Sequence, residues 1–111
     1  MSKITDNLET LLAQGQDSAV LRFSLGSAHI DQEPALAIEH LERAIEFNPS
    51  YSAAWKLLGK ALSRCNRTAE ARKAYSSGIE KAEMCGDIQA AKEMGVFLKR
   101  LEKAPRSRRD R

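Results

Sequence analysis

The sequence predicts an all-α protein of about six helices. Ala, Leu, Glu, Lys and Arg, which are strong helix formers, dominate the 111 residues. Aromatic residues make up only 5% of the chain, too few for a strand-rich sandwich or barrel. Apolar residues recur at three- and four-residue spacing, and no segment shows the alternation of a strand. A chain of this length forms one domain with a modest core.

Three helices are expected in the N-terminal half. The first ends before Gly15, and Asp17 or Ser18 caps the second by accepting hydrogen bonds from its free N–H groups. Proline at the first helical position loses no intrahelical bond, so Pro34 begins the third helix, and Asn48 before a proline ends it. These helices cover about residues 3–14, 18–30 and 34–47.

Three more helices are expected in the C-terminal half. Thr68 is the predicted N-cap of the middle one, Gly86 follows its end, and Asp87 caps the last. They cover about residues 51–64, 69–84 and 88–103. Their predicted inward residues are Trp55, Leu58, Leu62, Ala71, Tyr75, Ile79, Ala82, Ile88, Ala91, Met94, Leu98 and Leu101.

The second helix pair contains a spaced motif of large and small residues. It reads Trp55-x2-Leu58-Gly59-x2-Leu62, followed by Ala71-x3-Tyr75 and Gly78. This pattern resembles the tetratricopeptide repeat (TPR), whose units are helix hairpins of about 34 residues. The resemblance implies that Gly59, Ala71 and Gly78 lie where helices cross closely.

The first pair matches the same pattern less fully. Leu25-Gly26 and Leu41 fit, but Arg22 stands in the Trp position and His29 in the Tyr position. The last helix, with Met94-Gly95, looks like the first half of a third unit. The resemblance therefore implies a right-handed superhelix of helix hairpins, similar to small stand-alone bacterial TPR proteins. The expected domain spans 1–104, with an extra N-terminal helix, repeats at about 18–50 and 51–85 and a capping helix at 87–103; a basic disordered tail occupies 105–111.

TPR proteins typically bind peptide segments or helices in a concave groove lined by the first helix of each pair. Six cations and few carboxylates fall on that predicted face, which favours an acidic or amphipathic segment of another protein.

Some TPR proteins hold a peptide carboxylate in a clamp, and half of that clamp is similar to Lys56, Lys60 and Arg64. In place of its other half this sequence has Phe23 and Ser27. Val20, Phe23 and Ile30 suggest an apolar end. The expected groove residues are Phe23, Ser27, Lys56, Leu57, Lys60, Arg64, Lys92, Val96, Lys99 and Arg100.

Charge is distributed unevenly along the chain. Residues 1–50 hold three basic and eight acidic residues, a net charge of −5, whereas residues 51–111 hold 15 basic and seven acidic ones, a net charge of +8. This polarity leaves an alternative open, in which the negative half of one copy meets the positive half of another in a homodimer or larger assembly.

Catalytic and metal-binding patterns are not evident in the sequence. His29 and His40 fall on different predicted helices, and Cys65 and Cys85 form neither a CxxC nor a Cys/His metal pattern. We therefore expect no enzyme activity, no metal and no cofactor; an enzyme with a composite site is a distant alternative.

With no signal peptide or membrane span in the sequence, the expected location is the cytoplasm without membrane contact. Nucleic acid is an unlikely partner because no aromatic platform is present.

Overall fold

A computed structural model of the protein describes residues 3–103. Within this range it contains six α-helices and no strand. The helices are α1 (Lys3–Ala13), α2 (Ala19–His29), α3 (Pro34–Phe47), α4 (Ser52–Arg64), α5 (Thr68–Met84) and α6 (Ile88–Lys103). The tail expected at 105–111 lies outside the described residues.

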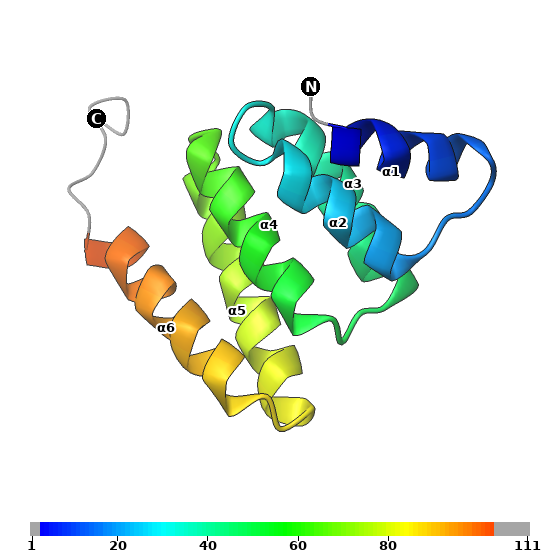
Figure 1. Ribbon diagram of the computed structural model, residues 1–111. Coiled ribbons are helices and arrows are strands. Elements are labelled where there is room, and N and C mark those ends of the chain that lie inside the picture. Colours follow the sequence, from blue (N-terminus) through cyan, green and yellow to red (C-terminus); the bar gives the residue numbers. More distant parts are fainter. Residues whose placement is uncertain (1–2, 104–111) are drawn as a thin grey trace.

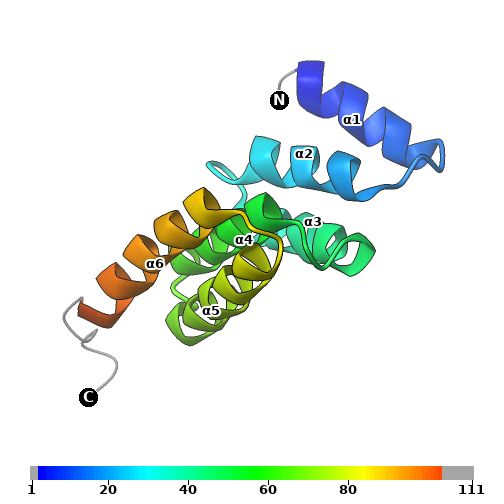
Figure 2. The same ribbon diagram turned by 90° about the horizontal axis from the view of Figure 1, so that it is seen from below.

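The helices stack as successive antiparallel neighbours, as shown in Figure 1. The view from below in Figure 2 separates two layers, with α2, α4 and α6 in one and α3 and α5 in the other. The helix α1 lies at the end of the stack, beyond α2. This arrangement is the expected all-α, TPR-like stack of helix hairpins.

Short local signals set the helix ends. The Ser18 hydroxyl accepts a hydrogen bond of 3.1 Å from the backbone N–H of Leu21, and Asp87 Oδ1 accepts one of 3.2 Å from Ala90 N–H. Gly15 and Gly86 adopt φ values of +85° and +77°, the left-handed conformation that ends α1 and α5 without a Cβ penalty. The predicted N-cap at Thr68 is wrong: Thr68 is the first residue of α5.

The N-cap position of α5 is taken by the residue before Thr68. Arg67 is the N-cap residue of α5, and it makes no side-chain capping hydrogen bond. Its side chain instead forms two 2.7 Å hydrogen bonds with the carboxylate of Glu70, in the first turn of the helix. This ion pair places a carboxylate near the positive end of the helix dipole.

The core runs along the junction between the two layers. Leu25, Leu41 and Met94 are its largest fully buried side chains, and Tyr75 is only 3% exposed. Two predictions of side-chain position are wrong. Ile88, expected inward, is the first residue of α6 and is 55% exposed, and Ile30, expected on the groove face, is buried in the core.

Glycines allow neighbouring helices to approach closely. A Cβ added at Gly26 would lie 2.5 Å from Leu41 Cγ, and one added at Gly59 would lie 2.4 Å from Tyr75 Cε1. At Gly78 it would lie 2.5 Å from Met94 Sδ. These contacts confirm the crossings predicted at Gly59 and Gly78. Gly95 corresponds to Gly26 and Gly59 in its repeat, but an added Cβ there would meet nothing within 4 Å.

Among the helices described, none has the length and apolar character needed to cross a membrane.

Candidate functional site

The predicted groove face is formed by the layer of α2, α4 and α6 (Figure 2). A hollow of about 240 Å³ lies on this face between α4 and α6. Tyr75 and Phe97 contribute aromatic surface to it, with ring centroids 5.7 Å apart. Burial raises the pKa of Tyr75 to about 12, so its hydroxyl stays neutral. The hollow is lined by Lys60, Ser63, Arg64, Tyr75, Phe97, Arg100 and Leu101.

Lys56 lies beside a carboxylate of the same face. Its Nζ donates a 2.6 Å hydrogen bond to Oε1 of Glu93, and the amide of Gln89 donates a 3.1 Å hydrogen bond to Oε2. The pKa of Glu93 is lowered, chiefly by the hydrogen bond from Lys56 and then by the one from Gln89. The charge of Lys56 is thus compensated within the chain.

Arg64 is also paired, at the opposite end of α4. Its Nη1 contacts Oδ1 of Asp31 and donates a 3.3 Å hydrogen bond to the backbone carbonyl of Ile30. Ile30 is the C-cap residue of α2, so this cation satisfies a carbonyl at the end of that helix. Arg64 therefore ties the second repeat to the first.

Four of the six predicted groove cations are free of such pairing. Lys60, Lys92, Lys99 and Arg100 are exposed, and within residues 3–103 none of them has a carboxylate oxygen within 4.0 Å. The guanidinium of Arg100 lies 5.8 Å from the centroid of the Phe97 ring. The groove face keeps an excess of positive charge, but a smaller one than the sequence suggested.

The remaining predicted groove residues are less exposed or apolar. Phe23 is half-buried and packs on the Tyr51 ring, with centroids 5.0 Å apart. Leu57 is half-buried against the core, whereas Ser27 is exposed and Val96 is 48% exposed. Phe23 and Leu57 therefore act partly as packing residues.

The sequence does not predict the three large aromatic or aliphatic residues of the hollow as a binding surface; these are Tyr75, Phe97 and Leu101. The helical spacing predicts Tyr75 and Leu101 as inward residues and leaves Phe97 outside the predicted apolar stripe. One signal could have found it: Phe97 and Leu101 are four residues apart and share a helix face. The lining from α5 depends on how that helix packs beneath α4 and α6.

A two-layered stack of helix hairpins (Figure 2) defines this chain as a helical-repeat protein. The family described as tetratricopeptide repeat matches residues 28–94, so the chain belongs to the TPR family. TPR proteins are generally non-catalytic interaction modules, and the fold supports the binding of another protein.

Two similar proteins match over nearly their whole length. The TPR repeat-containing protein PA0015 of Pseudomonas aeruginosa is 49% identical over 100 residues, which are 89% of this chain and 95% of that protein. The solution structure of protein BPP2914 from Bordetella parapertussis gives a TM-score of 0.81 at 45% identity, covering 93% of this chain and 90% of that one. Both come from bacteria, as the resemblance predicted.

A more distant similarity is to a crystal structure of MamA protein, with a TM-score of 0.69 and 27% identity. It covers 89% of this chain and 57% of that chain.

Proposed function

We propose that this protein is a non-catalytic adaptor whose groove holds an acidic or amphipathic segment of another protein. An apolar side chain of the segment occupies the hollow between α4 and α6, and neighbouring carboxylates pair with the free cations around it. Lys60 and Arg100 border the hollow, and Lys92 and Lys99 extend the positive face along α6.

The observation that carries this proposal is the combination of surfaces in the hollow. Phe97 and Leu101, which are half-buried, offer apolar area beside the buried Tyr75 ring, and exposed cations stand at the margin of the hollow. Apolar burial supplies affinity, while charge-assisted hydrogen bonds between cations and carboxylates set the orientation of the bound segment. Because these four cations form no ion pair within residues 3–103, they need not break one before they bind a ligand.

Within residues 3–103, the groove lacks the residues needed to hold the terminal carboxylate of a peptide in a clamp. Arg64 and Lys56 already hold Asp31 and Glu93. Phe23 and Ser27 supply no positive charge on α2. The internal carboxylates of the segment, rather than its terminal carboxylate, are therefore the expected ligands.

The test reverses free cations at the hollow without disturbing the intramolecular ion pairs. We would compare Lys60→Glu/Arg100→Glu with Lys73→Glu/Lys81→Glu, which makes the same change of charge on α5, in the other layer. Each untagged protein, immobilised, is used to capture proteins from a lysate of the source cells. Circular dichroism and thermal unfolding confirm that both variants fold.

We expect the wild type and the α5 variant to capture one or more proteins from the lysate that the groove variant, Lys60→Glu/Arg100→Glu, does not capture. Those proteins should carry an acidic segment whose synthetic peptide, labelled with fluorescein, binds the wild type in an anisotropy titration. Affinity should fall with rising salt, because exposed charges are screened. Undiminished capture by the groove variant would contradict the proposal.

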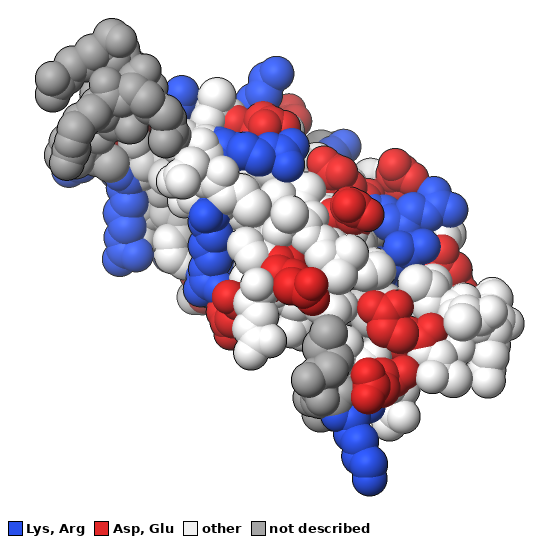
Figure 3. Space-filling model, turned by 90° about the horizontal axis from the view of Figure 1, so that it is seen from above, with Lys and Arg blue, Asp and Glu red and all other residues white. Residues whose placement is uncertain are grey.

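A second candidate function is self-association, and the distribution of charge favours it. Viewed from above in Figure 3, Asp and Glu gather over the half that carries the N-terminal helices, and Lys and Arg dominate toward the opposite end. Head-to-tail contact between copies would bring these surfaces together. Sedimentation equilibrium at low and high salt tests this: a 12.3 kDa species at all salt concentrations excludes self-association.

A further inference from the structure

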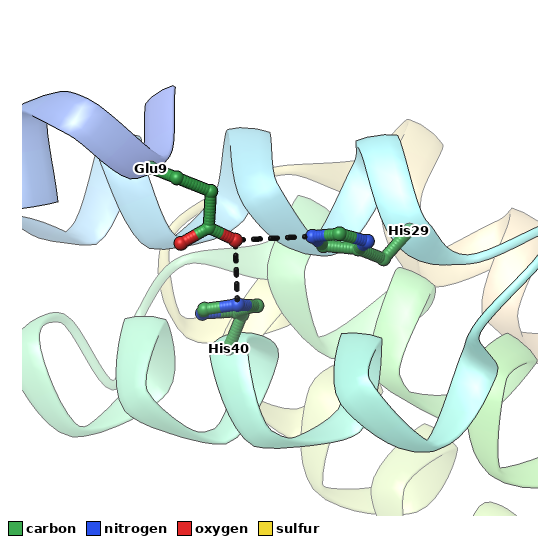
Figure 4. Close-up of side chains that lie close together, drawn as sticks. All are labelled: Glu9, His29 and His40. Atoms are coloured by element: carbon green, nitrogen blue, oxygen red, sulfur yellow. Dashed lines mark hydrogen bonds and ion pairs between the residues drawn. The ribbon is translucent and has the colours of Figure 1, made fainter. Parts of the chain in front are cut away.

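We propose that Glu9, His29 and His40 form a binding site for a divalent transition-metal ion, with zinc favoured by the ligand chemistry. The three residues come from α1, α2 and α3, and Figure 4 shows their side chains converging. One ligand atom from each can be chosen so that all three lie within 4.8 Å of one another. The site lies in the first repeat and the helix before it, apart from the hollow between α4 and α6.

The distances are close to those of a tetrahedral site. Ligand atoms about 2.1 Å from a tetrahedral ion lie about 3.4 Å from one another. Oε2 of Glu9 is 3.3 Å from Nε2 of His29 and 4.0 Å from Nε2 of His40. The first pair already has the required separation. The other two separations must shorten by about 1.4 Å at most. The His29 and His40 rings lie nearly parallel, at 14°, with centroids 5.7 Å apart (Figure 4), so the His40 ring must also turn to point its Nε2 lone pair at the ion.

The surroundings of His29 fit a metal ligand. Its Nδ1 lies 3.3 Å from Oε1 of Glu33, on the side of the ring away from Glu9. A histidine that binds a metal through one nitrogen usually donates its other N–H to a carboxylate, which orients the ring and strengthens the ligand. Glu33 provides that carboxylate, so Nε2 of His29 is left to face the ion.

His40 supplies an independent indication. Its side chain is 7% exposed, and Nε2 is a buried nitrogen without a hydrogen-bond partner among the described residues. A buried polar atom that lacks a partner is costly, and a metal ion would provide one once Nε2 has lost its proton. Two imidazoles and one carboxylate favour zinc and similar ions over calcium or magnesium, which prefer oxygen ligands.

Arg22 opposes metal binding and therefore offers a sharp test. Its Nη1 lies 3.1 Å from Nδ1 of His40. Because a guanidinium only donates hydrogen bonds, Nδ1 accepts and the ring proton is on Nε2. Coordination through Nε2 removes this proton, and Nδ1 must then become the N–H, so the contact with Arg22 breaks. Arg22 would remain on Asp17, to which it makes hydrogen bonds of 2.8 and 2.9 Å.

Bound metal would fasten α1 to the repeats. Glu9 is the α1 ligand, and its side chain is 45% exposed, which gives an ion access to the buried imidazoles. An ion that binds the folded chain more tightly than the unfolded one raises the unfolding temperature. Three protein ligands leave a fourth position for water.

The experiment titrates Zn²⁺ into the untagged protein by isothermal calorimetry. Cys65→Ser and Cys85→Ser are present in every sample, because free thiols also bind zinc. Glu9→Gln, His29→Gln and His40→Gln are compared with Asp6→Asn, a matched loss of an exposed carboxylate on α1. Circular dichroism checks folding; Glu9→Gln changes a partly exposed side chain, so this variant remains informative if a histidine variant unfolds.

We expect one zinc ion per chain, affinity at least about tenfold weaker in each ligand variant, and an unchanged affinity in Asp6→Asn. Co²⁺ should give the visible absorption of a nitrogen- and oxygen-ligated tetrahedral ion. Arg22→Gln, whose amide oxygen accepts a hydrogen bond from Nδ1–H, should tighten zinc binding by about tenfold. The proposal is overturned by the absence of saturable zinc binding, or by binding that Glu9→Gln leaves unchanged. Weaker binding in folded Arg22→Gln contradicts coordination by His40 through Nε2.

Discussion

Lys56 Nζ on α4 lies 2.6 Å from Glu93 Oε1 on α6, so an ion pair joins two neighbouring helices of the groove layer. Both side chains are about one-third exposed, at 35% and 38%. The carboxylate of Glu93 therefore pairs with a lysine that an acidic ligand could otherwise bind. A carboxylate of a bound ligand would have to compete with Glu93 for Lys56.

Replacing Glu93 with Gln should strengthen the binding of an acidic segment. Gln keeps the size of the side chain but releases Lys56, so we expect affinity to rise about two- to tenfold, which corresponds to about 0.4–1.4 kcal/mol. Anisotropy titration of the segment captured by the wild type measures this change. Glu102→Gln, an equal change of charge on the same helix, is the control. Equal affinities for Glu93→Gln and the wild type would show that Lys56 does not contact the ligand.

Gly59 and Gly95 should respond in opposite ways to alanine. A Cβ at position 59 meets the buried Tyr75 ring at 2.4 Å, and overpacking of this kind costs about 1–3 kcal/mol. At position 95 nothing lies within 4 Å, so alanine should stabilise the helix by up to about 1 kcal/mol. Urea unfolding of the two variants gives the comparison. Destabilisation by Gly95→Ala would mean that an unseen neighbour packs against this position.

Ser18 and Thr68 provide a second matched pair. Ser18→Ala removes the hydroxyl that accepts from Leu21 N–H and should cost about 1 kcal/mol. Thr68 is the first residue of α5, after the N-cap Arg67, and does not act as the cap. Thr68→Ala should therefore change the free energy of unfolding by less than about 0.5 kcal/mol. Thermal and urea unfolding check both values. Similar losses in the two variants would restore Thr68 as a capping residue.

The ion pair between Asp17 and Arg22 should make stability depend on pH in the acid range. The hydrogen bond from Arg22 is the main cause that lowers the pKa of Asp17 below its ordinary value of 3.8. A lowered folded-state pKa means that this stabilisation is complete above the ordinary value and disappears as pH falls through the folded value. A double-mutant cycle with Asp17→Asn and Arg22→Gln measures the coupling by urea unfolding. We expect the coupling measured at about pH 6 to be smaller at about pH 2, because protonation of Asp17 removes it; coupling of the same size at both would refute the assignment.

Local sequence signals predicted most of the fold. Helix periodicity, the glycines at 15 and 86 and the caps predicted at Asp17 or Ser18 and at Asp87 act within a few residues, so they can be recognised without tertiary contacts. The structure decides between the first two in favour of Ser18. The Leu-Gly and Ala-x3-Tyr spacings also indicated the repeat, and at Gly26 and Gly59 the glycine does mark a close helix crossing. The exposure of Ile88 could not be predicted in this way, since helical spacing gives a face but not how far the neighbouring helix extends over it.

The sequence alone thus determined the helices, their order and the family, because those follow from local backbone preferences and repeated spacing. Tertiary structure decided which charges remain available in the groove: Lys56 and Glu93 are 37 residues apart, and Arg64 and Asp31 are 33 apart. It also brought together Glu9, His29 and His40, whose spacing matches no metal motif. Side chains on separate helices meet only after packing fixes the distances and rotations of those helices, which periodicity within one helix does not encode.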